Sequence, residues 1–148
     1  MARLLLLVTV ALCVLGSGVA SGSPSLKRCS ASHLGVSVET QGLSGTAWIG
    51  VTVRNTGARC TLGGSVSYLI KRAGFRAAVR GNPLKIPVKG AIGHGRSKLV
   101  KADWSNWCGR RVRFALTISY AGKTRHSGFA ALPRCLDRKS PSQIVMIY

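Results

Sequence analysis

The sequence is poor in acidic residues. Only Glu39, Asp103 and Asp137 are acidic among 148 residues, against 22 lysine and arginine residues and a formal net charge of +19. Three carboxylates and three histidines leave few groups for general acid–base catalysis, and glycoside hydrolysis would need two of the three acids to meet. The chain also lacks a G-x-S-x-G or H-E-x-x-H motif. We therefore expect a protein that is not an enzyme, with no catalytic residues, no cofactor and no bound metal.

The chain has only one long apolar run, and it lies at the start. Leu4–Leu15 follows the basic Arg3 and precedes a stretch of small residues. This arrangement is typical of a secretory signal peptide, cleaved after Ala20 or one or two residues later. The run is shorter than the roughly 20 residues of a spanning helix, and Cys13 lacks the small preceding residue that lipid modification requires. We expect residues 1–20 to be removed and the product to be secreted, or held non-covalently at the cell surface.

Paired cysteine motifs are also missing. Removal of Cys13 leaves four cysteines, Cys29, Cys60, Cys108 and Cys135, and an even number in a small exported domain predicts disulfides. Four cysteines allow three connectivities. We favour Cys29–Cys60 and Cys108–Cys135 because each pair then encloses one compact block. A zinc site is the weaker alternative, since the chain has no C-x-x-C and no histidine at ligand spacing from a cysteine.

No segment after the signal peptide has the apolar stripe of a helix, and the dominant period is two. The clearest example runs from Val112 to Tyr120, with apolar residues at every second position. Further strands are expected over residues 34–38, 47–54, 66–70 and 143–148. Glycine-containing turn signals separate these segments.

This pattern predicts an all-β fold. We expect an antiparallel immunoglobulin-like β-sandwich of about seven or eight strands, with a barrel as the alternative. Residues 29–148 are expected to form a single domain, preceded by a flexible leader over residues 21–28.

Four short motifs resemble those of a known family. They are Asn-Thr-Gly at 55–57, Cys-x-Leu-x-Gly at 60–64, Trp-x-Asn-Trp-Cys at 104–108 and Pro-x-Cys at 133–135. Their order resembles a family of secreted domains of unknown function from high-GC Gram-positive bacteria, over residues 29–148. The resemblance implies an immunoglobulin-like sandwich and the cysteine pairing favoured above, but no activity. The chain departs from the family at Gly64-Ser65-Val66, where members carry a Gly-Tyr-Pro step.

The missing acids form one continuous gap between Glu39 and Asp103. Few of the cations in this gap can find an acidic partner, so they are solvated or meet an external anion. An arginine-favouring genome would raise the arginine content without explaining the missing acids. We expect a polyanion-binding surface made of Lys71, Arg72, Arg76, Arg80, Lys85, Lys89, Arg96, Lys98, Lys101, Arg111 and Arg113.

Export decides which polyanions the protein meets. Anionic cell-wall polymers or acidic polysaccharides are the expected partners, and an anionic membrane surface or nucleic acid is the alternative. Single-stranded nucleic acid would call for aromatic side chains within the basic surface, for which Trp48, Phe75, Trp104 and Trp107 are candidates, whereas Tyr68 falls on an apolar face. We expect Trp104 and Trp107 to pack against a disulfide. A protein-interaction domain whose charge only steers association is the remaining hypothesis.

Overall fold

The computed structural model describes residues 25–148. The predicted signal peptide, with Cys13 and the cleavage site, lies outside the described residues. After the 3₁₀ turn η1 (Ala31–His33) the chain forms eleven strands, which are β1 (Leu34–Leu43), β2 (Thr46–Asn55), β3 (Cys60–Leu62), β4 (Ser65–Arg72), β5 (Phe75–Arg76), β6 (Leu84–Pro87), β7 (Gly90–Ile92), β8 (Ser97–Ser105), β9 (Phe114–Tyr120), β10 (Lys123–Gly128) and β11 (Gln143–Ile147).

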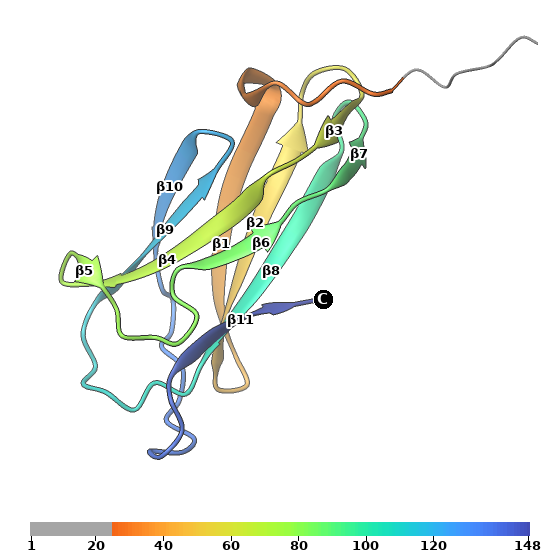
Figure 1. Ribbon diagram of the computed structural model, residues 1–148. Coiled ribbons are helices and arrows are strands. Elements are labelled where there is room, and N and C mark those ends of the chain that lie inside the picture. Colours follow the sequence, from red (N-terminus) through yellow and green to blue (C-terminus); the bar gives the residue numbers. More distant parts are fainter. Residues whose placement is uncertain (1–24) are drawn as a thin grey trace, which may run out of the picture.

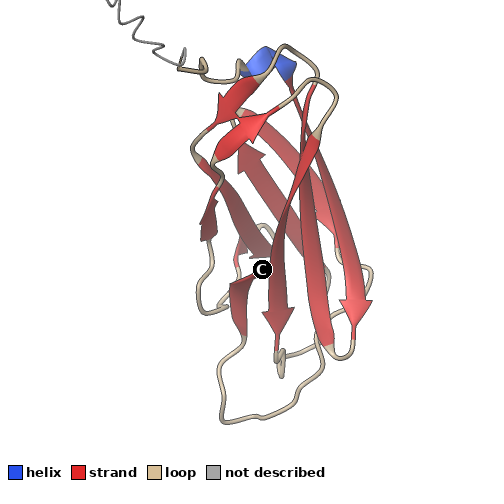
Figure 2. Ribbon diagram, turned by 90° about the vertical axis from the view of Figure 1, so that its right-hand side faces the viewer, coloured by secondary structure: helices blue, strands red, loops and turns tan. Residues whose placement is uncertain are grey.

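The strands form a sandwich of two antiparallel sheets (Figures 1 and 2). One sheet has the order β1-β2-β8-β11, the other β10-β9-β4-β5 with β6 also paired to β4, and β3 and β7 form a separate ribbon. This arrangement matches the immunoglobulin type, except that the C-terminal strand β11 fills the edge position beside β8. The predicted all-β, antiparallel sandwich is confirmed.

The number of strands exceeds the predicted seven or eight. Three of the additional strands, β3, β5 and β7, contain two or three residues, which is too short for an alternating pattern to be recognised. We also missed β8, although Val100, Ala102 and Trp104 alternate inward along it. The strand expected from Val112 begins instead at Phe114, and Val112 is half-buried in the preceding loop.

The core lies between the inner faces of the two sheets. Tyr68 is fully buried, as expected, and its hydroxyl donates to the Val100 carbonyl of the opposite sheet at 3.0 Å. Burial raises the pKa of this phenol. Trp104 is also fully buried and makes edge-to-face contacts with Trp107 and Phe114, at centroid distances of 5.9 and 5.0 Å. The contact between Trp104 of β8 and Phe114 of β9 joins the two sheets across the core.

Both predicted disulfides are present. Cys29–Cys60 attaches the N-terminal segment to β3, and Cys108–Cys135 joins the β8–β9 loop to the β10–β11 loop. In the leader, the Lys27 carbonyl accepts a backbone hydrogen bond from Thr61, so this part of the segment lies along β3. One bridge thus ties the N-terminal segment to β3 and the other ties two loops together, whereas the disulfide of antibody domains joins one sheet to the other.

The antiparallel arrangement collects the loops at two ends. One end carries η1 and Cys29–Cys60. The other end carries the β1–β2 turn, the β4–β5 turn, the β8–β9 loop and the β10–β11 loop, away from η1 (Figures 1 and 2). Cys108–Cys135 lies at this second end.

Candidate functional site: an arginine-rich end

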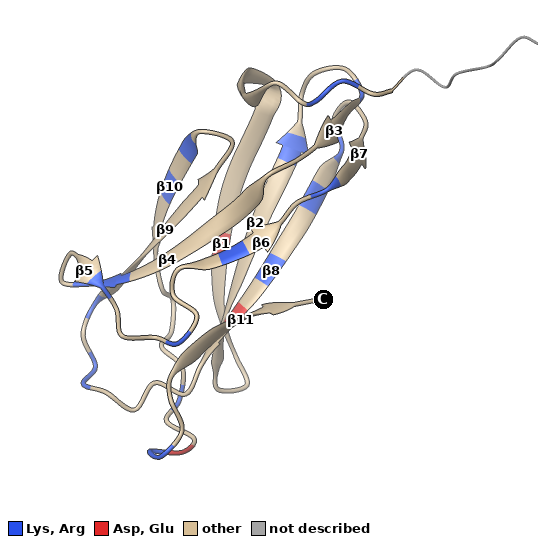
Figure 3. Ribbon diagram, viewed as in Figure 1, with Lys and Arg blue, Asp and Glu red and all other residues tan. Residues whose placement is uncertain are grey.

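The predicted polyanion-binding residues do not form one patch. Figure 3 shows lysine and arginine distributed along the whole sandwich. By their positions on the strands the predicted residues separate into Lys71, Arg72, Arg76, Arg111 and Arg113 at the end away from η1, Arg80 beside Gln143 at the start of β11, Lys85 and Lys101 along the middle, and Lys89, Arg96 and Lys98 at the η1 end. The largest group is therefore the one at the Cys108–Cys135 end.

Four further cations, which the sequence analysis missed, join this group. They lie in the β8–β9 and β10–β11 loops, and Cys108–Cys135 connects these loops. The two cysteines are 27 residues apart in the sequence, so the proximity of the loops depends on the fold. We call this surface the arginine end, made of Lys71, Arg72, Arg76, Arg110, Arg111, Arg113, Arg134, Arg138 and Lys139.

The arginine end has two adjoining hollows with Arg111 and Leu132 in the walls of both. The larger, of about 650 Å³, is lined by apolar side chains that include Phe129, together with Arg113. The smaller, of about 400 Å³, is lined by Trp107, by both cysteines of the disulfide, and by Arg134 and Arg138. Trp107 thus lies beside the bridge, as we expected from the sequence, whereas Trp104 packs in the core against aromatic rings.

These hollows suit a particular class of ligand. Guanidinium groups bind carboxylate, phosphate and sulfate oxygens through two parallel hydrogen bonds. The guanidinium of Arg72 lies 6.0 Å from the ring centroid of Trp107, within the range of a cation–π contact, which restricts where this cation can point. The apolar side chains that line the larger hollow add contact surface for a ligand with carbon groups next to its charge.

Asn106 fixes the β10–β11 loop. Its side-chain oxygen accepts hydrogen bonds from the backbone N–H groups of Leu136 and Asp137 at 2.8 and 3.0 Å. Its amide group donates to the carbonyls of Asp137 and Ser140, both at 2.8 Å. The side chain is buried and the backbone has φ of 55°, a conformation that asparagine tolerates. This single residue therefore sets the position of the loop that carries Arg138 and Lys139.

Asp137, the acid at the arginine end, forms hydrogen bonds within its own loop. Its carboxylate accepts hydrogen bonds from the Ser140 hydroxyl and from the backbone N–H of Lys139, the latter at 2.8 Å. These bonds hold the pKa of Asp137 below its usual value. The carboxylate stays ionised at neutral pH and closes the loop with these bonds.

The aromatic candidates for stacking on nucleic acid bases are dispersed. Tyr68 and Trp104 belong to the core, and Trp48 is half-buried on β2. Trp107 lines the smaller hollow, and Phe75 lies on the β4–β5 hairpin. They form no row along a basic groove.

The η1 end also has a basic hollow, of about 400 Å³. Lys27, Arg28 and Arg59 line it together with His33 and Cys60. The second histidine at this end, His94, lies 3.1 Å from the carbonyl of Gly57. Two arginines line this hollow, against four around the two hollows of the arginine end.

Comparisons with known proteins identify no relative. A scan against protein-family models finds no match, and searches of curated proteins and of solved structures find none. The family resemblance of the cysteine motifs stays a prediction. Within residues 25–148 we find no helix long and apolar enough to cross a membrane, and no group of three or more histidine, cysteine or acidic side chains that could hold a metal ion.

Proposed function

We propose that this protein is an exported, non-enzymatic binding module whose arginine end holds anionic polymers of the cell envelope. One observation carries the proposal: cations of the β8–β9 and β10–β11 loops line two hollows, the cations of the β4–β5 hairpin lie at the same end, and the acid among them is engaged in its own loop. Because few acids are available to neutralise them, these cations attract external polyanions.

The rigidity of the arginine end supports binding. The Cys108–Cys135 bridge and the four hydrogen bonds of Asn106 hold two of its loops together. A surface that is already ordered loses less conformational entropy when it binds. Arginine also offers a planar, bidentate donor to phosphate and carboxylate, which lysine does not.

Export is part of the proposal. Two disulfides are typical of a domain that folds in an oxidising compartment. Together with the signal-peptide pattern of residues 1–20 they favour a secreted or surface-held protein. Wall polymers and acidic polysaccharides are then the first anions it meets.

A pair of charge-matched variants tests the proposal. The triple substitution Arg111→Gln, Arg113→Gln and Arg138→Gln removes three charges from the arginine end, and Arg59→Gln, Lys89→Gln and Arg96→Gln removes three from the η1 end. Binding to purified teichoic acid is measured at salt concentrations from about 50 to 500 mM. We expect the first triple to weaken binding at least roughly tenfold at the lowest salt, the second less than about threefold, and binding of the unmodified protein to decline steadily with salt.

Equal losses in both triples would mean that only the net charge matters, and the arginine end would not be the site. No binding at low salt, or binding that does not weaken with salt, would also contradict the proposal. Tighter binding to a single-stranded oligonucleotide than to teichoic acid would assign the surface to nucleic acid instead. A third variant, with lysine at the same three positions, retains the charge, and partial loss there would show that the planar guanidinium contributes.

A further inference from the structure

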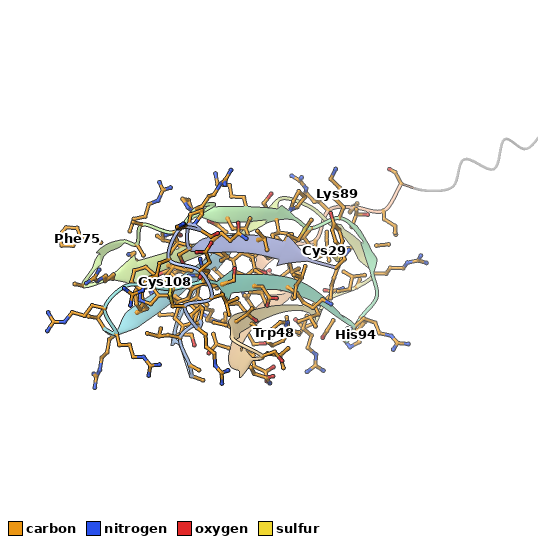
Figure 4. All side chains as sticks on the ribbon, turned by 90° about the horizontal axis from the view of Figure 1, so that it is seen from below. Cys29, Trp48, Phe75, Lys89, His94 and Cys108 are labelled. Atoms are coloured by element: carbon orange, nitrogen blue, oxygen red, sulfur yellow. A yellow bond between two sulfur atoms is a disulfide. The ribbon has the colours of Figure 1, made fainter. Side chains whose placement is uncertain are left out.

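The arginine end also carries the most exposed large apolar side chains of the described residues, apart from the C-terminal Tyr148. They are Phe75, Leu136 and Leu43, with exposed fractions of 79%, 69% and 58%. Each lies on a different connection, in the β4–β5 hairpin, the β10–β11 loop and next to the β1–β2 turn. In Figure 4 Phe75 projects away from the ribbon at one extremity of the molecule. Single exposed apolar residues are common, but here the three most exposed ones share the end of the sandwich that also carries the arginine end.

The fold holds these side chains on ordered backbone. Phe75 follows the Ala73-Gly74 turn, in which both residues have positive φ, as in the tight turns that suit hairpins. The N–H of Leu136 donates to Asn106. The turn after Leu43 is tied to the β10–β11 loop, because the N–H of Arg134 donates to the Gly45 carbonyl at 2.8 Å. The apolar tips are therefore presented on anchored loops.

Cations accompany two of these tips closely. Arg72 and Arg76 flank Phe75 in the hairpin, and Arg134 and Arg138 flank Leu136. A soluble polyanion needs the cations but has no use for the apolar tips. The surface of an anionic bilayer uses both, because the phosphates attract guanidinium groups while apolar side chains enter the boundary between head groups and acyl chains.

We propose that the arginine end docks on the surface of anionic membranes, with Phe75, Leu136 and Leu43 inserted at the level of the head groups. This inference rests on the proposed function, because the same cations supply the electrostatic attraction. It adds that anionic lipid is a target and that the inserted apolar side chains contribute a part of the binding free energy that salt does not screen. Zwitterionic bilayers, which carry no net charge, are expected to bind weakly.

Vesicle sedimentation tests the inference, with vesicles of phosphatidylglycerol and phosphatidylcholine in a ratio of about 3:7 and of phosphatidylcholine alone. The test variant combines Phe75→Ala with Leu136→Ala. The control combines Leu99→Ala with Val145→Ala, which truncates two exposed apolar residues on the outer face of the β1-β2-β8-β11 sheet. We expect the test variant to bind anionic vesicles at least roughly tenfold more weakly at about 150 mM salt, and the control within about twofold of the unmodified protein.

The binding of teichoic acid separates this inference from the proposed function. The Phe75→Ala, Leu136→Ala variant should bind that soluble polymer about as well as the unmodified protein. The triple variant of Arg111, Arg113 and Arg138 should bind both the polymer and the vesicles more weakly. Equal vesicle binding by the test and control variants would overturn the membrane inference and leave the polymer proposal intact. Binding to vesicles without binding to teichoic acid would contradict the proposed function and leave the membrane inference intact.

A fluorescent reporter gives an independent reading. Phe75→Trp places an indole at the hairpin tip, and we expect its emission to shift to the blue with anionic vesicles but not with teichoic acid. An unchanged emission maximum on bound vesicles would mean that the tip stays in water, which contradicts insertion.

Discussion

Three asparagines are the buried polar side chains of the described residues, and each one orders a loop through backbone hydrogen bonds. Asn55 accepts from the N–H of Gly57 and donates to the carbonyl of Ala58. Asn82 accepts from the N–H of Ile70 and donates to the carbonyls of Ile70 and Ala77. Asn106 binds backbone groups of the β10–β11 loop in the same way at the arginine end. Two of the three belong to the motifs on which the family resemblance is based, which gives those motifs a physical role.

The substitution Asn106→Ala removes four hydrogen bonds and leaves backbone groups of the β10–β11 loop without partners. We expect the free energy of unfolding to fall by about 2–4 kcal/mol, and binding to teichoic acid to weaken as well, because the loop that carries Arg138 loosens. Urea unfolding and polymer binding measure the two effects. The matched control Asn55→Ala should lose stability but retain polymer binding, since it lies at the η1 end. A stability loss below about 1 kcal/mol for Asn106→Ala would contradict the assigned role.

The burial of Asp103 predicts that the free energy of unfolding depends on pH. One of its carboxylate oxygens, Oδ1, is buried and has no hydrogen-bond partner, and burial raises the pKa of this group. The folded state therefore binds the proton more tightly than the unfolded chain, so this residue favours folding at low pH and disfavours it once the pH exceeds the folded pKa. Asp103→Asn should raise the free energy of unfolding at neutral pH by about 0.5–1 kcal/mol, with the gain shrinking as the pH falls toward about 4. Urea midpoints of both proteins between roughly pH 3 and 7 test this, and a gain that grows on acidification would refute it.

At the scale of the elements, β11 depends on one glycine. The N–H of Arg80 donates to the Ser142 carbonyl at 2.8 Å and the Arg80 carbonyl accepts from Ile144 at 2.9 Å, so this segment runs alongside β11. Gly81 follows it with φ of 80°, and a Cβ there would lie 2.6 Å from the carbonyl oxygen of Ile144. The close approach of these backbones is possible only because Gly81 has no side chain.

We expect Gly81→Ala to lower the free energy of unfolding by about 2–4 kcal/mol, since it combines an unfavourable φ with a backbone clash. Gly122 provides the matched control, because it has φ of 75° but open space where a Cβ would lie. Gly122→Ala should lose only about 1 kcal/mol. Thermal or urea unfolding measures both, and similar losses in the two variants would show that the contact with Ile144 is unimportant.

At the scale of the whole molecule, the charge imbalance opposes folding. Without Arg3 of the signal peptide, 21 of the 22 lysine and arginine residues remain against three acids, and their mutual repulsion is stronger in the compact state than in the unfolded chain. Salt screens this repulsion. We expect the Tm to rise by about 3–6 °C between roughly 20 and 200 mM sodium chloride, in line with a gain of roughly 1 kcal/mol.

Scanning calorimetry of the unliganded protein measures this rise. Either charge-neutralising triple should have a higher Tm than the unmodified protein at low salt and a smaller response to salt. A Tm that falls with added salt would contradict the expectation and imply that attractive charge pairs dominate.

The sequence by itself determined the class of the fold and the cysteine chemistry. Alternation of apolar residues requires only local geometry, because successive side chains of a strand point to opposite faces. It predicted β1, β2, β4 and β9, whereas the nine-residue β8 was missed although it alternates in the same way. The even number of cysteines after export predicted two disulfides, and among three possible connectivities the favoured one, in which each bridge encloses a compact block, is the one present. The net charge followed from the numbers of basic and acidic residues.

Only the tertiary structure decided where the charge gathers. Arg72, Arg111 and Arg138 lie on three connections that are distant in sequence, and antiparallel pairing with the Cys108–Cys135 bridge brings these connections to one end. The sequence grouped cations by their order in the chain, and the fold separated Lys89 and Lys98 from Arg111 and Arg113. The exposure of Phe75, Leu136 and Leu43 could not be predicted for the same reason, since the exposure of an apolar residue depends on its neighbours in space.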